Sequence, residues 1–216
     1  MTAGKRARRP ATTDIRILIP VALLVGAGVF LASRPNTPEA HIDLSHAPVG
    51  TRIPLAGAQA AKLSSPDGQS PVRSILNVRK RMRYGEFVWN DSGVGPGGVW
   101  IRIDLERQII SVFRAGDEIG TAVILYGADE KPTPTGQLSI REKLKDHRSN
   151  TYDAPMPYTM RLTDDGVAIH GSNVRWGAAT HGCIGVPLGF AAKLFDQIKV
   201  GDQVLILPAG PKPAKV

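Results

Sequence analysis

From residue 99 onward, short runs of alternating apolar and polar residues are separated by turn residues, and this pattern constrains the fold more than any other feature of the chain. The runs VWIRIDL, QIISVF and EIGTAVILYG have the length and the Val and Ile content of β-strands. Glu106 and Arg107 separate the first two runs, which predicts a hairpin, and a turn at Ala115 and Gly116 precedes the third. The segment is therefore predicted to be rich in strands rather than a helical bundle.

The rest of this segment predicts more strands and one helix. The turn KPTPTG at 131–136 feeds a strand candidate at 137–144, and further short strands are expected at 166–171 and 203–207. A helix is predicted from apolar residues at helical spacing before Gly201, namely Leu188, Ala191, Ala192, Phe195 and Ile198. We expect a mainly β domain at 99–208, with a short helix near its C-terminal end and a tail at 209–216.

The N-terminal region predicts a membrane anchor. Residues 17–33 carry no charge and follow the basic cluster KRARR at 5–9. A helix of that length spans about 25 Å, and flanking arginines can extend toward the lipid headgroups. Positive charge stays on the cytoplasmic side, so we expect a cytoplasmic segment at 1–16, one pass through the inner membrane at 17–33, and the remainder on the periplasmic side. A cleaved export signal and a buried core helix are the alternatives.

Between the anchor and the β domain, the composition changes twice. Residues 34–72 are rich in Pro, Ala, Ser and Gly without a sustained period, which predicts a linker. Residues 73–98 are intermediate and are interpreted as a lead-in segment, either part of the domain or a continuation of the linker.

The charge of the chain argues against a nucleic-acid-binding protein. The formal net charge is +8, but residues from 36 onward carry 21 basic and 18 acidic side chains, so the excess lies near the anchor. The basic run from Arg73 to Arg83 contains no recognisable nucleic-acid-binding motif and is interpreted as a solvated segment.

The segment from Ile169 to Pro187, IHGSNVRWGAATHGCIGVP, combines two histidines with the single cysteine of the chain. A cysteine nucleophile reacts as the thiolate, and a neighbouring imidazole favours that form. His170 ends a predicted strand 13 residues before Cys183, so one loop could return the thiol to the imidazole. Gly182 removes side-chain bulk where a carbonyl must approach and leaves backbone N–H groups for an oxyanion hole.

Each of these residues also has a structural interpretation. A lone cysteine can be a small buried apolar residue, and a histidine at a strand end can be a satisfied polar residue. His181 could orient the substrate or be structural, and Thr180 could anchor the loop by hydrogen bonding. A zinc site built from His170, His181 and Cys183 is a further alternative.

The elements THGCI at 180–184 and IHG at 169–171 closely resemble the catalytic signature of L,D-transpeptidases of the YkuD type. The resemblance extends over 99–207 through the opening strands, the KPTPTG turn and YDAPMPYTMRL at 152–162. It implies a YkuD-like β-sandwich that acts on peptidoglycan stem peptides without a cofactor or metal.

The resemblance also assigns roles to individual residues. It implies Cys183 as nucleophile, His170 as base and the Gly171 carbonyl as orienter of the imidazole. It further implies that Thr180, His181 and Gly182 shape the site or the oxyanion hole. Tyr158 could line the substrate cleft or belong to the core.

Two features depart from the family pattern. Gly185 stands two positions after the cysteine, where family members commonly have Arg or Asn, and Arg161 or Arg175 could replace that contact. The loop from His170 to Cys183 is also shorter than in many relatives. Both departures affect the prediction of substrate choice more than that of the chemistry.

The predicted function is peptidoglycan L,D-transpeptidation through a Cys183 thioester with a stem tetrapeptide, followed by transfer to an acceptor amine in wall cross-linking. One alternative uses the same acyl-enzyme for hydrolysis, D-amino-acid exchange, or attachment or release of a wall protein. Another is a non-catalytic, membrane-anchored wall-binding protein.

Overall fold

The computed structural model describes residues 47–210, except 64, 69, 70, 79, 129, 150 and 152. Contacts divide the chain into residues 1–41 and 42–216, and every described residue lies in the second unit. No helix in this described part is long and apolar enough to cross a membrane. The predicted anchor at 17–33, the cytoplasmic segment at 1–16 and most of the tail at 209–216 lie outside the described residues.

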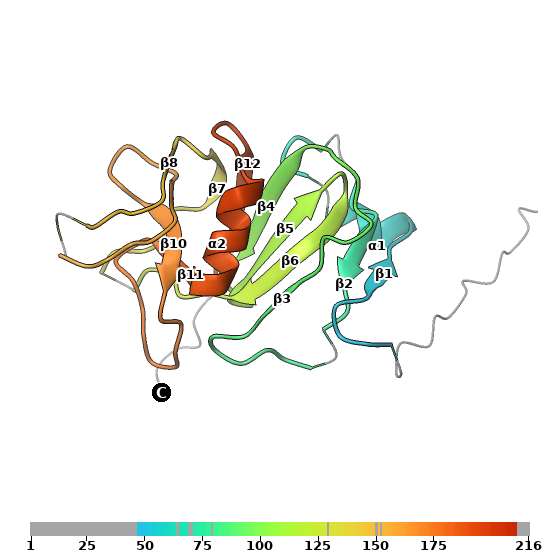
Figure 1. Ribbon diagram of the computed structural model, residues 1–216, viewed down its shortest axis with the longest axis horizontal. Coiled ribbons are helices and arrows are strands. Elements are labelled where there is room, and N and C mark those ends of the chain that lie inside the picture. Colours follow the sequence, from blue (N-terminus) through green and yellow to red (C-terminus); the bar gives the residue numbers. More distant parts are fainter. Residues whose placement is uncertain are drawn as a thin grey trace, which may run out of the picture. The chain divides into compact units, whose positions relative to one another are not determined.

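The described residues form two sheets and two helices (Figure 1). The larger sheet runs in the order β1-β2-β6-β5-β4-β12-β7, and β3 also pairs with β6. Its strands are β1 (Arg52–Pro54), β2 (Ser74–Leu76), β3 (Phe87–Trp89), β4 (Val99–Asp104), β5 (Ile109–Arg114), β6 (Asp117–Val123), β7 (Gly136–Ser139) and β12 (Gln203–Leu207). The smaller sheet runs β11-β10-β9-β8, with β8 (Glu142–Leu144), β9 (Thr159–Arg161), β10 (Ala168–Ser172) and β11 (Ile184–Pro187).

The predicted hairpin between the first two strands is confirmed, and a second hairpin follows it. β4 pairs antiparallel with β5, and β5 with β6. The second connection uses Ala115 and Gly116, both with positive φ, which suits a two-residue turn that follows the twist of the strands. The prediction of a mainly β domain with a helix near its C-terminal end is also confirmed.

The prediction of a single strand at 137–144 is wrong, because the chain passes from one sheet to the other within these residues. Residues 136–139 form β7, which pairs with β12, whereas residues 142–144 form β8, which pairs with β9. Ile140 lies at the crossing and is fully buried in the core. The change of sheet lets one short segment contribute to both layers.

The helix α2 (Leu188–Gln197) packs between the two sheets, beside β10, β11 and β6 (Figure 1). Its buried residues are Phe190, Ala191 and Leu194, and Leu188 is 55% exposed. Of the five apolar residues whose spacing predicted the helix, Ala191 and Ile198 are buried, whereas Leu188 is exposed. The Phe190 ring packs edge-to-face on Phe87 and Trp89 of β3, and this contact sets the rotation of the helix.

The predicted linker at 34–72 is structured in its described part, which begins at residue 47. It contains β1 and the short helix α1 (Gly57–Ala61), and β1 pairs with β2. The reason is a second apolar cluster on the outer face of the larger sheet, where Trp100 stacks on Phe113 with ring centroids 4.4 Å apart. Leu55, Leu63 and Val72 of this segment cover the cluster together with Ile75 of β2.

The lead-in segment at 73–98 belongs to the same sheet. β2 runs parallel to β6 at Ser74 and Asp117, and β3 pairs antiparallel with β6 further along. Residues 74–76 and 87–89 of this segment are therefore strands of the larger sheet. The described basic residues of the 73–83 run, including Arg73, Lys80 and Arg81, are exposed.

Candidate active site

The two sheet strands β10 and β11 bring His170 and Cys183 to one region. β10 carries His170 and pairs parallel with β11 in a register that places His170 opposite Gly185. Cys183 directly precedes β11. By strand geometry, the two Cα atoms are separated by about 8 Å, one strand spacing sideways and two residues along the strand.

The His170 ring has a defined orientation. It is 9% exposed, and its Nδ1 lies 3.0 Å from the Gly171 carbonyl oxygen. A carbonyl only accepts, so Nδ1 carries the hydrogen and donates it, which leaves the Nε2 lone pair to accept a proton. The predicted contact to the Gly171 carbonyl is thus present. Burial lowers the pKa of His170, opposed by the Gly171 contact, and the charge of His147 lowers it further.

The Cys183 thiol is partly buried and donates to the Gly166 carbonyl oxygen at a sulfur–oxygen distance of 3.9 Å. Burial raises the pKa of Cys183, the Ala168 backbone and the charge of Lys131 lower it, and Asp165 raises it. Burial therefore favours the neutral form of both the thiol and the imidazole.

The backbone before the nucleophile is held by the KPTPTG turn. The Thr133 hydroxyl donates to the Gly182 carbonyl at 2.9 Å and accepts from the Gly127 N–H at 2.9 Å. Gly182 has a φ of +98°, which favours glycine. A Cβ at Gly127 would lie 2.2 Å from the Lys131 carbonyl oxygen and 2.9 Å from the Gly182 Cα. Gly127 therefore permits the turn and the nucleophile segment to pack closely.

Thr180 takes the loop-anchoring position that was one of its two interpretations. Its hydroxyl donates to the Cys183 carbonyl, its N–H donates to the Tyr126 carbonyl at 3.0 Å, and its carbonyl accepts from the Ala128 N–H at 3.1 Å. These bonds close the loop that ends at the nucleophile onto the segment after β6.

Cys183 opens into a cleft of about 350 Å³. Its polar and charged lining residues include Lys131, Glu142, His147, Arg161, Asp165 and His181. His181 and Arg161, both predicted from the sequence, thus share the cleft with the thiol. Lys131, His147 and Asp165 were not predicted, although Lys131 belongs to the KPTPTG turn that had been singled out.

The other predicted substrate residues lie elsewhere. The Tyr158 ring packs edge-to-face on Phe195 with centroids 5.7 Å apart, and the residue does not line the cleft. This is the core interpretation of Tyr158. Arg175 is exposed and also lies outside the cleft lining. A role for either residue in substrate binding stays a prediction.

Gly185 has a packing reason for its size. A Cβ there would lie 3.0 Å from the Ser172 Cβ and 3.4 Å from the Leu125 Cβ. Its backbone forms two hydrogen bonds with Leu125, of 2.8 and 3.0 Å, and joins β11 to the segment after β6. A long side chain at this position would require its neighbours to move. Of the two arginines considered as replacements, only Arg161 reaches the cleft.

The zinc alternative would need three ligands in one place. Within the described ranges, no three His, Cys, Asp or Glu side chains are grouped as a metal would require.

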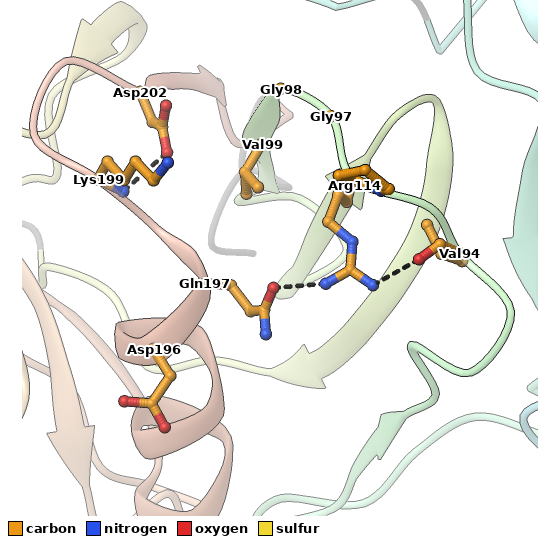
Figure 2. Close-up of a pocket in the computed structure, with 10 residues that line it drawn as sticks. Val94, Gly97, Gly98, Val99, Arg114, Asp196, Gln197, Lys199 and Asp202 are labelled. Carbon is orange, nitrogen blue, oxygen red and sulfur yellow. Dashed lines mark hydrogen bonds between the residues drawn. The ribbon is translucent and has the colours of Figure 1, made fainter.

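A larger cleft, of about 560 Å³, lies at the C-terminal end of α2 (Figure 2). Arg114 donates to the Gln197 side chain at 2.6 Å and to the Val94 carbonyl at 2.9 Å, as Figure 2 shows. These bonds tie the glycine-rich segment before β4 to the helix. None of the residues lining this cleft is a cysteine or histidine, so the smaller cleft at Cys183 is the better candidate for the chemistry.

The model of the YkuD L,D-transpeptidase catalytic domain family matches residues 98–206. The chain belongs to this family. The match includes both sheet strands that carry the candidate site, the KPTPTG turn and α2. A comparison with curated proteins finds no match.

Solved L,D-transpeptidase structures resemble the chain. One from Stackebrandtia nassauensis is 22% identical with a TM-score of 0.49, and the match covers 57% of this chain and 64% of that one. An Enterococcus faecium mutant enzyme is 27% identical with a TM-score of 0.47, covering 52% and 50%. Mycobacterium tuberculosis L,D-transpeptidase 1 is 26% identical with a TM-score of 0.44, covering 50% and 61%. The chain thus spans less than two thirds of the length of each.

Proposed function

We propose that the chain is a peptidoglycan L,D-transpeptidase with Cys183 as its nucleophile. The observation that carries the proposal is the family match over 98–206, which contains Cys183 at a cleft and His170, of fixed tautomer, on the strand that pairs with β11. The proposed donor is a stem tetrapeptide that ends in D-Ala. The proposed acceptor is an amine of a second stem.

The first half of the proposed reaction forms the acyl-enzyme. His170 Nε2 takes the Cys183 proton, and the sulfur forms a bond to the donor carbonyl carbon. In this proposed step, the backbone N–H groups of Gly182 and Cys183 stabilise the oxyanion. The carbon–nitrogen bond to D-Ala then breaks, and His170 returns the proton to the leaving amine. A thioester and free D-Ala result.

In the second half, the acceptor amine attacks the thioester carbonyl and passes its proton through His170 to the departing thiolate. A new amide forms and Cys183 is regenerated. Water in place of the amine gives a tripeptide, and the acceptor choice decides between cross-linking and hydrolysis.

The test uses the purified protein, a disaccharide tetrapeptide, and the Cys183→Ala and His170→Ala variants. Cross-linked dimer from wild type supports transpeptidation, whereas tripeptide alone supports hydrolysis. Loss of all product in Cys183→Ala is expected, with strong reduction in His170→Ala. Full activity of Cys183→Ala would end the proposal, and an inert thiol toward alkylating probes would favour a wall-binding protein.

We also propose that residues 17–33 anchor the protein in the inner membrane with the domain on the periplasmic side. The uncharged run and the preceding basic cluster support this topology. Protease added to intact spheroplasts should degrade the domain, and survival of the domain under those conditions would contradict the topology.

A further inference from the structure

Lys131 is carried by a turn that is fixed to the nucleophile segment. Its N–H donates to the Ala128 carbonyl at 3.0 Å, and the next turn residue but one, Thr133, is bonded to Gly182. The Lys131 Cγ would lie 3.7 Å from a Cβ at Gly182, the residue before the nucleophile. The Lys131 side chain therefore lies at the wall of the Cys183 cleft nearest the nucleophile backbone.

The other charges of this cleft have partners. Arg161 Nε lies 2.9 Å from Glu142 Oε2, and Asp165 accepts a hydrogen bond from the Thr163 hydroxyl. Among the ion pairs of the described residues, none includes Lys131. Its ammonium is near enough to the sulfur for its charge to lower the pKa of Cys183. Lys131 is thus a cation on the cleft of the reacting atom, and no ion pair within 47–210, as far as those residues are described, includes it.

The donor required by the proposed function carries an anion close to the attacked carbonyl. A tetrapeptide attacked at its third carbonyl has one residue beyond the scissile bond, and that residue ends in a free carboxylate. Sulfur attacks from about 3 Å, one residue spans about 3.5 Å, and a hydrogen bond adds about 2.8 Å. A cation up to about 9 Å from the sulfur can therefore contact this carboxylate.

We propose that Lys131 binds the free C-terminal carboxylate of the donor stem peptide and so selects donors that end one residue after the attacked carbonyl. The inference rests on the proposed function and adds to it the residue that determines donor length. Lys131 is a specificity determinant that contacts the leaving residue. It does not act as the base, which is the role proposed for His170.

The test compares two donors with the full-length protein, one with a free terminal carboxylate and one with the same peptide amidated at its C-terminus. The rate of acyl-enzyme formation is followed by intact mass spectrometry over a range of donor concentrations. Wild type is expected to prefer the carboxylate by about 10-fold, the effect of one charge-assisted hydrogen bond at a partly exposed site.

The variant Lys131→Met should lose most of that preference, chiefly through a higher half-saturating concentration of the carboxylate donor. Lys131→Arg keeps the charge and should retain part of the preference. Lys193→Ala removes an exposed lysine on α2, outside the cleft, and should behave as wild type. Thermal unfolding of each variant checks the fold.

The ratio between the two donors separates recognition from reactivity. If Lys131 acted only on the thiol, Lys131→Met would slow both donors equally, and the proposal for Lys131 would be wrong. Equal rates for both donors in wild type would overturn it as well, with the proposed function intact. If wild type forms no acyl-enzyme with either donor, the proposed function itself fails.

Discussion

Glu118 of β6 provides a test of the fold at the point where the segment before the β domain joins the larger sheet. Its side chain is 5% exposed, and Oε2 accepts the Leu76 N–H of β2 at 2.7 Å. Burial raises the pKa of Glu118 to about 7 from an ordinary value of 4.5, although hydrogen bonds from Ser111 and Leu76 oppose the shift. The folded state therefore holds a proton that the unfolded chain releases near pH 4.5.

Because the folded state binds this proton more tightly than the unfolded chain, raising the pH lowers the free energy of unfolding. The contribution of protonated Glu118 is fully present below about pH 4.5 and is lost as the pH rises through about 7. The two pKa values are separated by roughly 2.5 units, and each unit corresponds to 1.36 kcal/mol, so the loss is about 3 kcal/mol in total. Between pH 5 and pH 8 it is about 2 kcal/mol or slightly more.

The substitution Glu118→Gln removes the ionisation and keeps the size and the hydrogen-bonding groups. Urea unfolding followed by circular dichroism gives the free energy of unfolding of both proteins at pH 5, 6, 7 and 8. The gain of the variant over wild type should grow by about 2 kcal/mol or more from pH 5 to pH 8. The matched control is Glu130→Gln, at an exposed carboxylate. If the gain of Glu118→Gln changes with pH no more than that of the control, the reasoning is refuted.

Three further outcomes are expected. Thr133→Val should lower kcat/KM about 10-fold and the free energy of unfolding by about 1–2 kcal/mol, since it leaves the Gly182 carbonyl and Gly127 N–H without their partner; unchanged values in both assays would contradict its positioning role. Val72→Ala should cost about 1–3 kcal/mol in urea unfolding, because Val72 is 1% exposed and covers Trp100, and a neutral effect would mean that this segment is not part of the folded unit. The acidic limb of the kcat/KM profile should lie below about pH 6.5, because burial lowers the pKa of His170, and a limb above pH 7 would refute that environment.

Local patterns were sufficient for the strands that follow residue 99. The hairpin of β4 and β5 and the turn at Ala115 and Gly116 are encoded by neighbouring residues, so alternation and turn chemistry predicted them. The candidate pair of Cys183 and His170 was predicted from their separation of 13 residues, and the parallel pairing of β10 with β11 sets His170 opposite Gly185, two residues after Cys183.

Features that depend on distant contacts were not predicted. Leu55, Leu63 and Val72 are isolated apolar residues in a segment that otherwise has the composition of a linker, and only the stacked rings of Trp100 and Phe113 explain their burial. The same applies to the rotation of α2, which depends on Trp89 and Phe87 of a strand about 100 residues earlier in the sequence.

The cleft residues beside Cys183 show the same limit. Lys131, His147 and Asp165 come from three separate loops, and no spacing in the sequence connects them with residue 183. A signal was present for Lys131, because it begins the KPTPTG turn. Its proximity to the thiol depends on the bond from Thr133 to Gly182, a contact between residues far apart in the chain.

The central claim is that Cys183 forms a thioester with the donor peptide. Intact mass spectrometry of the protein incubated with a stem tetrapeptide tests it most directly. We expect an adduct with the mass of the donor minus D-Ala. It should be located on the peptide that contains Cys183 and be missing in Cys183→Ala. An adduct of the same mass in Cys183→Ala, or none in wild type under conditions where donor is consumed, would contradict the account.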